Sequence, residues 1–246
     1  CLFATYVVGQ FLFNGSNEGG DVVVPYTLLG ILVMVIAVVF SRVHLPEIKH
    51  EETEEDRIKD TRIMKLFKHH PMFVFGLFSL LAYEIAEISI NSYFINFVTG
   101  QGWMDDNSAS MVLTVALGFF MVGRFLGSWI MRRIPAERML MYCSLGSVSC
   151  LGVVLLDIGH WSMYALIANY LFEAIMFPTI FSLSLQGLGN LTKSASSLLM
   201  MTPIGGCFFL LMGYVADQTN LVVPFLIPFI GYFIVLLYAS ELSRKS

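Results

Sequence analysis

The sequence predicts an all-α membrane protein, a bundle of about seven full transmembrane helices preceded by a truncated one. Hydrophobic residues make up 57% of the chain and charged residues only 13%, whereas soluble domains carry about 25% charged residues. The apolar residues gather in stretches of about 20, the length that a helix needs to cross a bilayer. The basic residues fall between alternate stretches only, which is the charge pattern of a multi-pass membrane protein.

Seven stretches are long and apolar enough to cross the bilayer as helices. They are residues 22–43, 72–99, 108–131, 138–157, 161–187, 195–217 and 221–241. Residues 1–14 are also apolar but too short for a comfortable crossing, and the chain opens partway through this hydrophobic segment. The segment lacks the basic start and the small-residue cleavage site of a signal peptide. We therefore expect earlier helices to precede it in the full protein.

The positions of the basic residues predict the orientation. All 14 Lys and Arg lie in one alternate set of loops or in the adjoining helix ends. This set consists of the loops 44–71, 132–137 and 188–194 and the tail after residue 241. Because cytoplasmic loops carry the excess of Lys and Arg, we expect this side, with the C-terminus, to face the cytoplasm. A miscounted helix would have scattered the basic residues over both sides.

The one long polar segment predicts the division of the chain. Residues 44–71 carry seven acidic side chains that nearly balance their basic ones, and no basic surface remains that would suggest nucleic acid as a partner. We expect residues 1–43 to be the last two helices of an earlier unit and residues 72–246 to form a six-helix bundle. Two helical halves joined by a cytoplasmic linker are typical of secondary transporters.

Three glutamates lie in the middle of apolar stretches: Glu84 and Glu87 in the stretch 72–99, and Glu173 in the stretch 161–187. A carboxylate at membrane depth costs about 2.5–3.5 kcal/mol on insertion scales. Each glutamate alone could simply be protonated and hydrogen-bonded to a neighbouring helix. Three of them at similar depth on two helices favour a functional role in a substrate, ion or proton path.

Helical spacing places these acids beside amides. Glu84, Glu87 and Asn91 fall within about 60° of one another around their helix, and Asn169 and Glu173, four residues apart, share a face of theirs. These polar faces predict a shared polar cavity inside the bundle.

Aromatic side chains lie near the polar faces, among them Tyr83, Phe94, Tyr170 and Phe177. Carboxylates and amides can hydrogen-bond the hydroxyl groups of a polyhydroxylated ligand, while rings cover its apolar faces. The combination suits a sugar.

Two further segments are candidates for gating. Arg124 lies about two turns inside the cytoplasmic end of its helix, in GRFLGSWIMRR, and could equally be an anchor at the interface. Pro203, followed by Gly205 and Gly206, predicts a kink that would suit a moving helix, although a bend without a gating role explains it as well.

Other chemistry finds little support. The four cysteines lie inside predicted helices without metal-ligand spacing, so we interpret them as packing residues and expect no metal site. Paired carboxylates can do acid–base work, which leaves an intramembrane enzyme as an alternative. However, no histidine lies at mid-membrane, and HExxH, GxSxG and phosphate-binding glycine motifs are absent from the sequence. We therefore expect a carrier and not an enzyme.

Four segments match a known family. They are AIMFPTIFSLSLQGLG at 174–189, YEIAEISINSYFINF at 83–97, GRFLGSWI at 123–130 and LMGYVAD at 211–217. On these segments the chain resembles the fucose–galactose–glucose permease branch of the major facilitator superfamily, which are bacterial sugar/proton symporters. The resemblance covers essentially the whole chain and makes 1–14 the end of the fifth helix, 22–43 the sixth and 72–241 the seventh to twelfth.

The resemblance implies a multi-pass protein of the bacterial inner membrane that moves a monosaccharide by alternating access, without a cofactor and with a proton as coupling ion. The N-terminal half of the same transporter would be its missing partner, and the family's coupling carboxylates lie in that half. Glu87 and Asn96 match the family pattern. Glu84, Asn91 and Glu173 depart from it, so an amino sugar or a non-sugar solute stays open.

We accordingly predict a substrate site and a gate. The predicted substrate residues are Tyr83, Glu84, Glu87, Asn91, Asn96, Asn169, Glu173 and Phe177. The predicted gating residues are Arg124, Pro203, Gly205 and Gly206.

Overall fold

The computed structural model describes residues 23–42, 64 and 66–245, and these residues form helices joined by turns, without a strand. The first helices are α2 (Val23–Arg42), α4 (Pro71–Gly100), α5 (Asp106–Ile130), α6 (Ala136–Leu155), α7 (His160–Glu173) and α8 (Met176–Leu185). They are followed by η1 (Gly189–Leu191), α9 (Thr192–Leu199), η2 (Thr202–Phe208), α10 (Phe209–Gln218), η3 (Val223–Phe225) and α11 (Leu226–Lys245).

The all-α membrane class is confirmed. Within the described residues, six segments are long and apolar enough to cross a membrane, from Pro71–Gly100 to Val223–Arg244. Helix α2 matches the predicted stretch 22–43. The predicted short segment 1–14 and the linker up to residue 63 lie outside the described residues.

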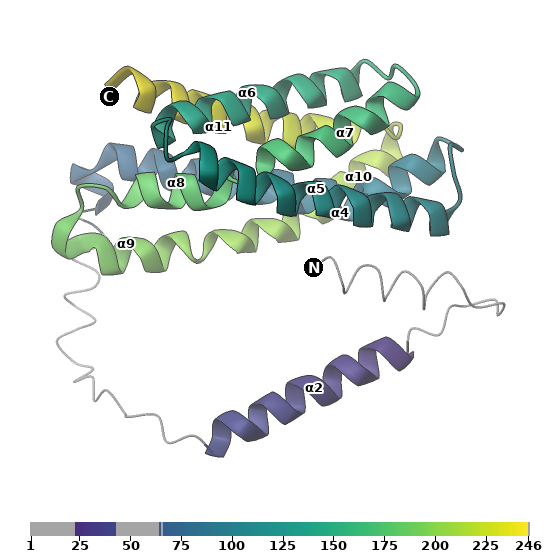
Figure 1. Ribbon diagram of the computed structural model, residues 1–246, viewed down its shortest axis with the longest axis horizontal. Helices are drawn as coiled ribbons and strands as arrows, with labels where there is room; N and C mark the ends of the chain where they lie inside the picture. The colour runs from purple at the N-terminus through teal and green to yellow at the C-terminus, as the bar shows by residue number, and fades with distance from the viewer. Residues whose placement is uncertain (1–22, 43–63, 65, 246) are drawn as a thin grey trace.

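Helices α4 to α11 form the bundle, whose members run side by side (Figure 1). Helix α4 lies at its centre and packs against α11, η2 and α8, while α6 packs against α11 and α7, and α5 covers α7. Four large side chains that are fully buried between these helices are Tyr83, Phe94, Tyr170 and Tyr232. The core is therefore aromatic, and several of its rings carry a hydroxyl group that needs a hydrogen-bond partner.

The basic side chains of the bundle lie towards one of its ends. The loop between α5 and α6, the turn before α9 and the C-terminus lie at one end in Figure 1, and the α4–α5, α6–α7 and α10–α11 loops lie at the other. The first end carries Arg132, Arg133, Arg138, Lys193 and Arg244, and the second carries Asp105, Asp106, Asp157 and Asp217. At this second end Ser108 Oγ donates to Asp105 Oδ1 at 2.7 Å, which lowers the pKa of the Asp105 carboxyl. Which end faces the cytoplasm stays a prediction.

Helix α2 lies apart from this bundle in Figure 1, and its described side chains are exposed, including those of Ile31 to Val39. The predicted division into an earlier unit, a linker and a six-helix bundle stays a prediction.

Two of the spans are interrupted. Residues 174–175 form a turn between α7 and α8 within the span His160–Leu185. The span Gly189–Gln218 changes to a 3-10 helix over Thr202–Phe208, where the sequence predicted a kink at Pro203. Glycine lets this 3-10 segment approach α4, because a Cβ at Gly205 would lie 3.0 Å from side-chain atoms of Leu81 and Ile85. The structure thus contains the break, and its gating role stays a prediction.

Candidate functional site

The centre of the site is the side chain of Glu173, the last residue of α7, which is 0% exposed. Its Oε2 accepts a hydrogen bond from Asn169 Nδ2 at 2.8 Å and another from the Tyr232 hydroxyl of α11 at 2.5 Å. Asn169 Nδ2 also lies 3.5 Å from the Tyr232 oxygen. Two predicted site residues therefore meet, together with a tyrosine that the sequence analysis did not single out.

The interruption of the helix explains why side chains from other helices converge here. Pro178 has no N–H to donate to the carbonyl of Ala174, four residues earlier, and its ring opposes regular helix geometry. In the structure Arg124 Nε of α5 donates to the Ala174 carbonyl oxygen at 3.2 Å, and the Tyr83 hydroxyl of α4 donates to the Glu173 carbonyl at 3.0 Å. Two backbone carbonyls at the break are thus bonded by side chains, as a polar backbone inside a membrane requires.

Glycines bring α5 close enough for this contact. A Cβ at Gly123 would lie 2.6 Å from the Leu171 carbonyl oxygen, and one at Gly127 would overlap the side chain of Ile175. Small residues four apart allow such close approach of two membrane helices. In GRFLG, the glycines set the distance between α5 and α7, and Arg124 reaches the break from between them.

Glu87 lies beside this network on α4 and is half-buried. It is close enough to interact electrostatically with Tyr83, Glu173 and Arg124. The Arg124 guanidinium carbon also lies 4.9 Å from the centre of the Phe120 ring. Glu87, Glu173 and Arg124 therefore come together at the break. Spacing within a single helix could not indicate that Arg124 belongs to this group.

The remaining predicted residues surround this group less tightly. Glu84 is buried and interacts electrostatically with Glu87, and Asn91 is half-buried one turn further along α4. The ring of Phe177 lies 6.4 Å from that of Tyr83, centre to centre. Asn96 is exposed and lies nine residues beyond Glu87, towards the end of α4.

Asn96 lines a separate pocket of about 400 Å³ between α4 and α10. The polar residues of this pocket are Ser89, Ser92, Tyr93, Asn96, Tyr214 and Asp217. The sequence analysis quoted LMGYVAD but did not name Tyr214 or Asp217 as site residues, because an acid at the end of a span looks like part of the loop. The sequence analysis also missed Tyr232, because a single hydroxyl group in an apolar helix produces no periodic pattern.

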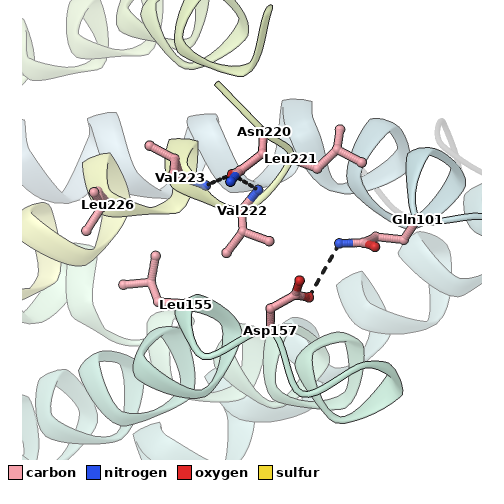
Figure 2. A pocket seen from close by; sticks show the side chains of 8 residues that line it. All are labelled: Gln101, Leu155, Asp157, Asn220, Leu221, Val222, Val223 and Leu226. Carbon is pink, nitrogen blue, oxygen red and sulfur yellow. Dashed lines mark hydrogen bonds between the residues drawn. The ribbon is translucent and has the colours of Figure 1, made fainter. Parts of the chain in front are cut away.

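A larger pocket, of about 640 Å³, lies at the end of the bundle where α4, α6 and α10 finish (Figure 2). Gln101 Nε2 donates to Asp157 Oδ1 at 3.4 Å across it, and Asn220 Oδ1 accepts the N–H groups of Val222 and Val223. The Asn220 bonds cap the chain where it enters the last span. The lining includes none of the predicted site residues, so size alone does not mark the site in this molecule.

The described part of the chain contains no group of three His, Cys, Asp or Glu side chains that could hold a metal ion. Its described cysteines, Cys143, Cys150 and Cys207, are unpaired, and only Cys143 is buried. The chemistry available at the break is therefore hydrogen bonding and proton binding by Glu, Asn, Tyr and Arg side chains.

A fold of six packed spans, two of them interrupted, with polar groups gathered inside the bundle, is an arrangement that transporters use. The model of the Major Facilitator Superfamily matches residues 3–210. The chain belongs to the major facilitator superfamily. Members of this family are transporters and not enzymes, so the intramembrane enzyme considered above is set aside.

Individual relatives narrow the comparison. The glucose/galactose transporter of Brucella abortus biovar 1 (strain 9-941) is 31% identical over 94% of this chain and 56% of its own length. The L-fucose-proton symporter of Escherichia coli (strain K12) is 27% identical over 90% of this chain and 52% of its own length. The crystal structure of FucP in the outward conformation matches with a TM-score of 0.72 and 25% identity, over 89% of this chain and 54% of that one. The chain thus spans about half the length of these relatives.

Proposed function

We propose that the chain is the C-terminal part of a bacterial inner-membrane transporter that moves a monosaccharide of the fucose, galactose or glucose type by proton symport. The printed names of the relatives support the sugar and, for the fucose symporter, the proton. On this proposal residues 1–43 are the last two helices of an N-terminal half, 44–71 are a cytoplasmic linker and 72–246 are the C-terminal half. The C-terminus is cytoplasmic, as the distribution of Lys and Arg favours.

One observation carries the proposal within the molecule: acids, an amide, tyrosines and an arginine from α4, α5, α7 and α11 converge on a broken helix inside the bundle. Burying such groups is costly unless they are used or paired. Among the predicted substrate residues, Glu87, Asn91 and Phe177 are half-buried and Asn96 is exposed. We assign sugar contact to these accessible residues. Tyr83, Asn169 and Glu173 are fully buried and form the wall behind them, with Glu84 beside it.

The gating prediction takes a specific form. Arg124 of α5 donates to the Ala174 carbonyl, so its gating role would consist in keeping or releasing this contact when the two halves of the transporter rock. The segment Thr202–Phe208 packs against α4 through Gly205 and Gly206 and is otherwise largely exposed. We propose that this 3-10 segment, with Pro203 at its start, is the flexing part of its span.

The test is uptake by the full-length transporter in a bacterium that lacks its own sugar uptake. Radiolabelled fucose, galactose, glucose and N-acetylglucosamine are offered with and without a protonophore. Saturable uptake of one sugar, abolished by the protonophore, supports the proposal and names the substrate. Uptake that the protonophore leaves unchanged contradicts proton coupling.

A second candidate is a permease of the same fold for an amino sugar or a non-sugar solute. Glu84, Asn91 and Glu173, which depart from the sugar permease pattern towards polarity, favour it. Uptake of N-acetylglucosamine alone supports the amino-sugar reading, and absence of uptake of all four sugars, despite good membrane expression, supports a non-sugar solute.

A further inference from the structure

The hydrogen bonds at Glu173 leave two buried atoms without a partner. Asn169 donates to Glu173 Oε2, but the other oxygen of each group, Glu173 Oε1 and Asn169 Oδ1, is buried and unbonded. Both are acceptors when the acid is ionised, so neither can satisfy the other. A buried polar atom without a partner costs about 1–3 kcal/mol, and more when it carries charge. An ionised Glu173 therefore fits this arrangement poorly.

One proton resolves both defects. When it binds Glu173 Oε1, that oxygen becomes a donor, and the unbonded Asn169 Oδ1 belongs to the amide that already faces the acid. The protonated acid can then donate to this amide oxygen while the amide donates to Oε2, and the Tyr232 hydroxyl continues to donate to Oε2. The step adds a proton to a lone pair of Oε1 and breaks no other bond. The proton comes from water on one side of the membrane and returns to water on the other.

The titratable groups that face Glu173 are an acid and phenols, and none of them carries a positive charge that would favour its ionised form. They are Glu87 and Tyr83 of α4, Tyr170 of α7 and Tyr232 of α11. Tyr170 makes no hydrogen bond to it, because its hydroxyl lacks a partner.

The nearby base does not pair with Glu173 either. Arg124 of α5 interacts with Glu87 and with the Ala174 carbonyl, and no ion pair to Glu173 exists among the described residues. A proton on Glu173 removes one negative charge from a group that holds three acids, Glu84, Glu87 and Glu173, and one base, Arg124. Net charge in a low-dielectric interior is expensive.

We propose that Glu173, held by Asn169 and Tyr232 at the α7–α8 break, is a proton-binding site of the C-terminal half of the transporter. It rests on the proposed function, and it adds a coupling site in this half. The proton is bound while Glu173 is paired with Asn169, as described above, and is released when this pair opens to water. Because Glu87 interacts electrostatically with both Glu173 and Arg124 and is assigned to the sugar, sugar binding and proton binding are linked through Glu87.

The transport test uses the full-length protein in proteoliposomes with Glu173→Gln. The Gln amide can donate to Asn169 Oδ1 as a protonated acid does, but it cannot release a proton. We expect sugar exchange between equal concentrations to persist, while accumulation driven by a proton gradient and sugar-induced proton uptake are lost. Accumulation by the variant equal to that of the wild type overturns the proposal. Glu137→Gln, on α6 outside this group, is the matched control and keeps both activities.

A second measurement needs no transport. Infrared spectra of the purified protein report the C=O stretch of protonated carboxyl groups, and we expect one such band to be missing in Glu173→Gln and present in Glu137→Gln. Tyr232→Phe removes a hydrogen bond to the carbonyl oxygen of the acid, so the band moves to higher frequency. Spectra that are the same in wild type and Glu173→Gln overturn the proposal. If the wild type moves no sugar but the band is lost in Glu173→Gln, the proposed function fails and the proton site stands.

Discussion

In both interrupted spans of the bundle a proline leaves a backbone carbonyl without its helical donor, and a different kind of donor bonds the carbonyl in each. Pro178 leaves the Ala174 carbonyl without its helical donor, and Pro203 does the same to the Leu199 carbonyl. Arg124 of another helix bonds the first carbonyl, at 3.2 Å, whereas the hydroxyl of Thr202, in the same span, bonds the second, at 2.8 Å. A remote donor ties helices together, but a local donor leaves its span free to move relative to its neighbours.

Burial follows the same division. Of the most apolar stretch of each span, 56% is buried in His160–Leu185 and 28% in Gly189–Gln218. Around the second break, Met201 and Ile204 are largely exposed, while Ala174 and Ile175 at the first are buried. Side chains from other helices thus hold the first break in place, whereas the side chains around the second are exposed in this chain, which spans about half the length of its relatives. Substitutions at the two breaks, and beside them, test this difference.

The largest effect is expected for Glu87→Gln, at the first break. Loss of a hydrogen bond to a charged group costs about 1.5–3 kcal/mol, so sugar uptake should fall about tenfold or more. Membrane insertion should be unchanged, because the amide is no harder to bury than the acid. Initial uptake rates, normalised to the amount of protein in the membrane, provide the measurement. Uptake at the wild-type rate would remove Glu87 from the sugar site.

Arg124→Leu tests whether the arginine ties α5 to the break. It leaves the Ala174 carbonyl without a donor, and a buried unbonded carbonyl costs about 1–3 kcal/mol. The midpoint of thermal unfolding in detergent should fall accordingly. Arg124→Lys separates this role from that of an interface anchor. Lysine keeps the charge but has a CH2 group where arginine has Nε, and it can donate only from Nζ, one atom further out. Rescue by lysine shows that a charged donor at this position suffices, and absence of rescue shows that the contact from Nε is specific.

Gly123→Ala tests the close approach that brings Arg124 to the break. The new Cβ would lie 2.6 Å from the backbone carbonyl of Leu171, so α5 must move away. Overpacking of this kind costs about 1–3 kcal/mol. Gly152→Ala is the matched control, because a Cβ there has no neighbour within 4 Å and alanine favours a helix. Equal unfolding midpoints for the two variants would contradict the packing argument.

The sequence predicted the spans well because hydrophobic stretches and alternating charge are direct consequences of the bilayer. It also predicted that Asn169 and Glu173 share a face, because residues four apart do so on any helix. It did not predict Tyr232 as a partner or the Arg124 bond to Ala174. Both depend on which helices become neighbours, and helical periodicity says which face is polar but not what it meets. The sequence analysis predicted a kink at Pro203 and did not single out Pro178, so the break between α7 and α8 was missed.

The smallest effect is expected at the second break, for Thr202→Val. Valine matches threonine in shape and removes the hydroxyl that bonds the Leu199 carbonyl, a bond worth about 0.5–1.5 kcal/mol. Because this bond joins residues of one span, its loss should cost less stability than Arg124→Leu and should leave the packing of α5 on α7 intact. Thermal unfolding of the two variants side by side decides the matter. If Thr202→Val lowers the midpoint as much as Arg124→Leu, the second break is held as firmly as the first. That result would contradict the proposal that the segment with Pro203, Gly205 and Gly206 flexes.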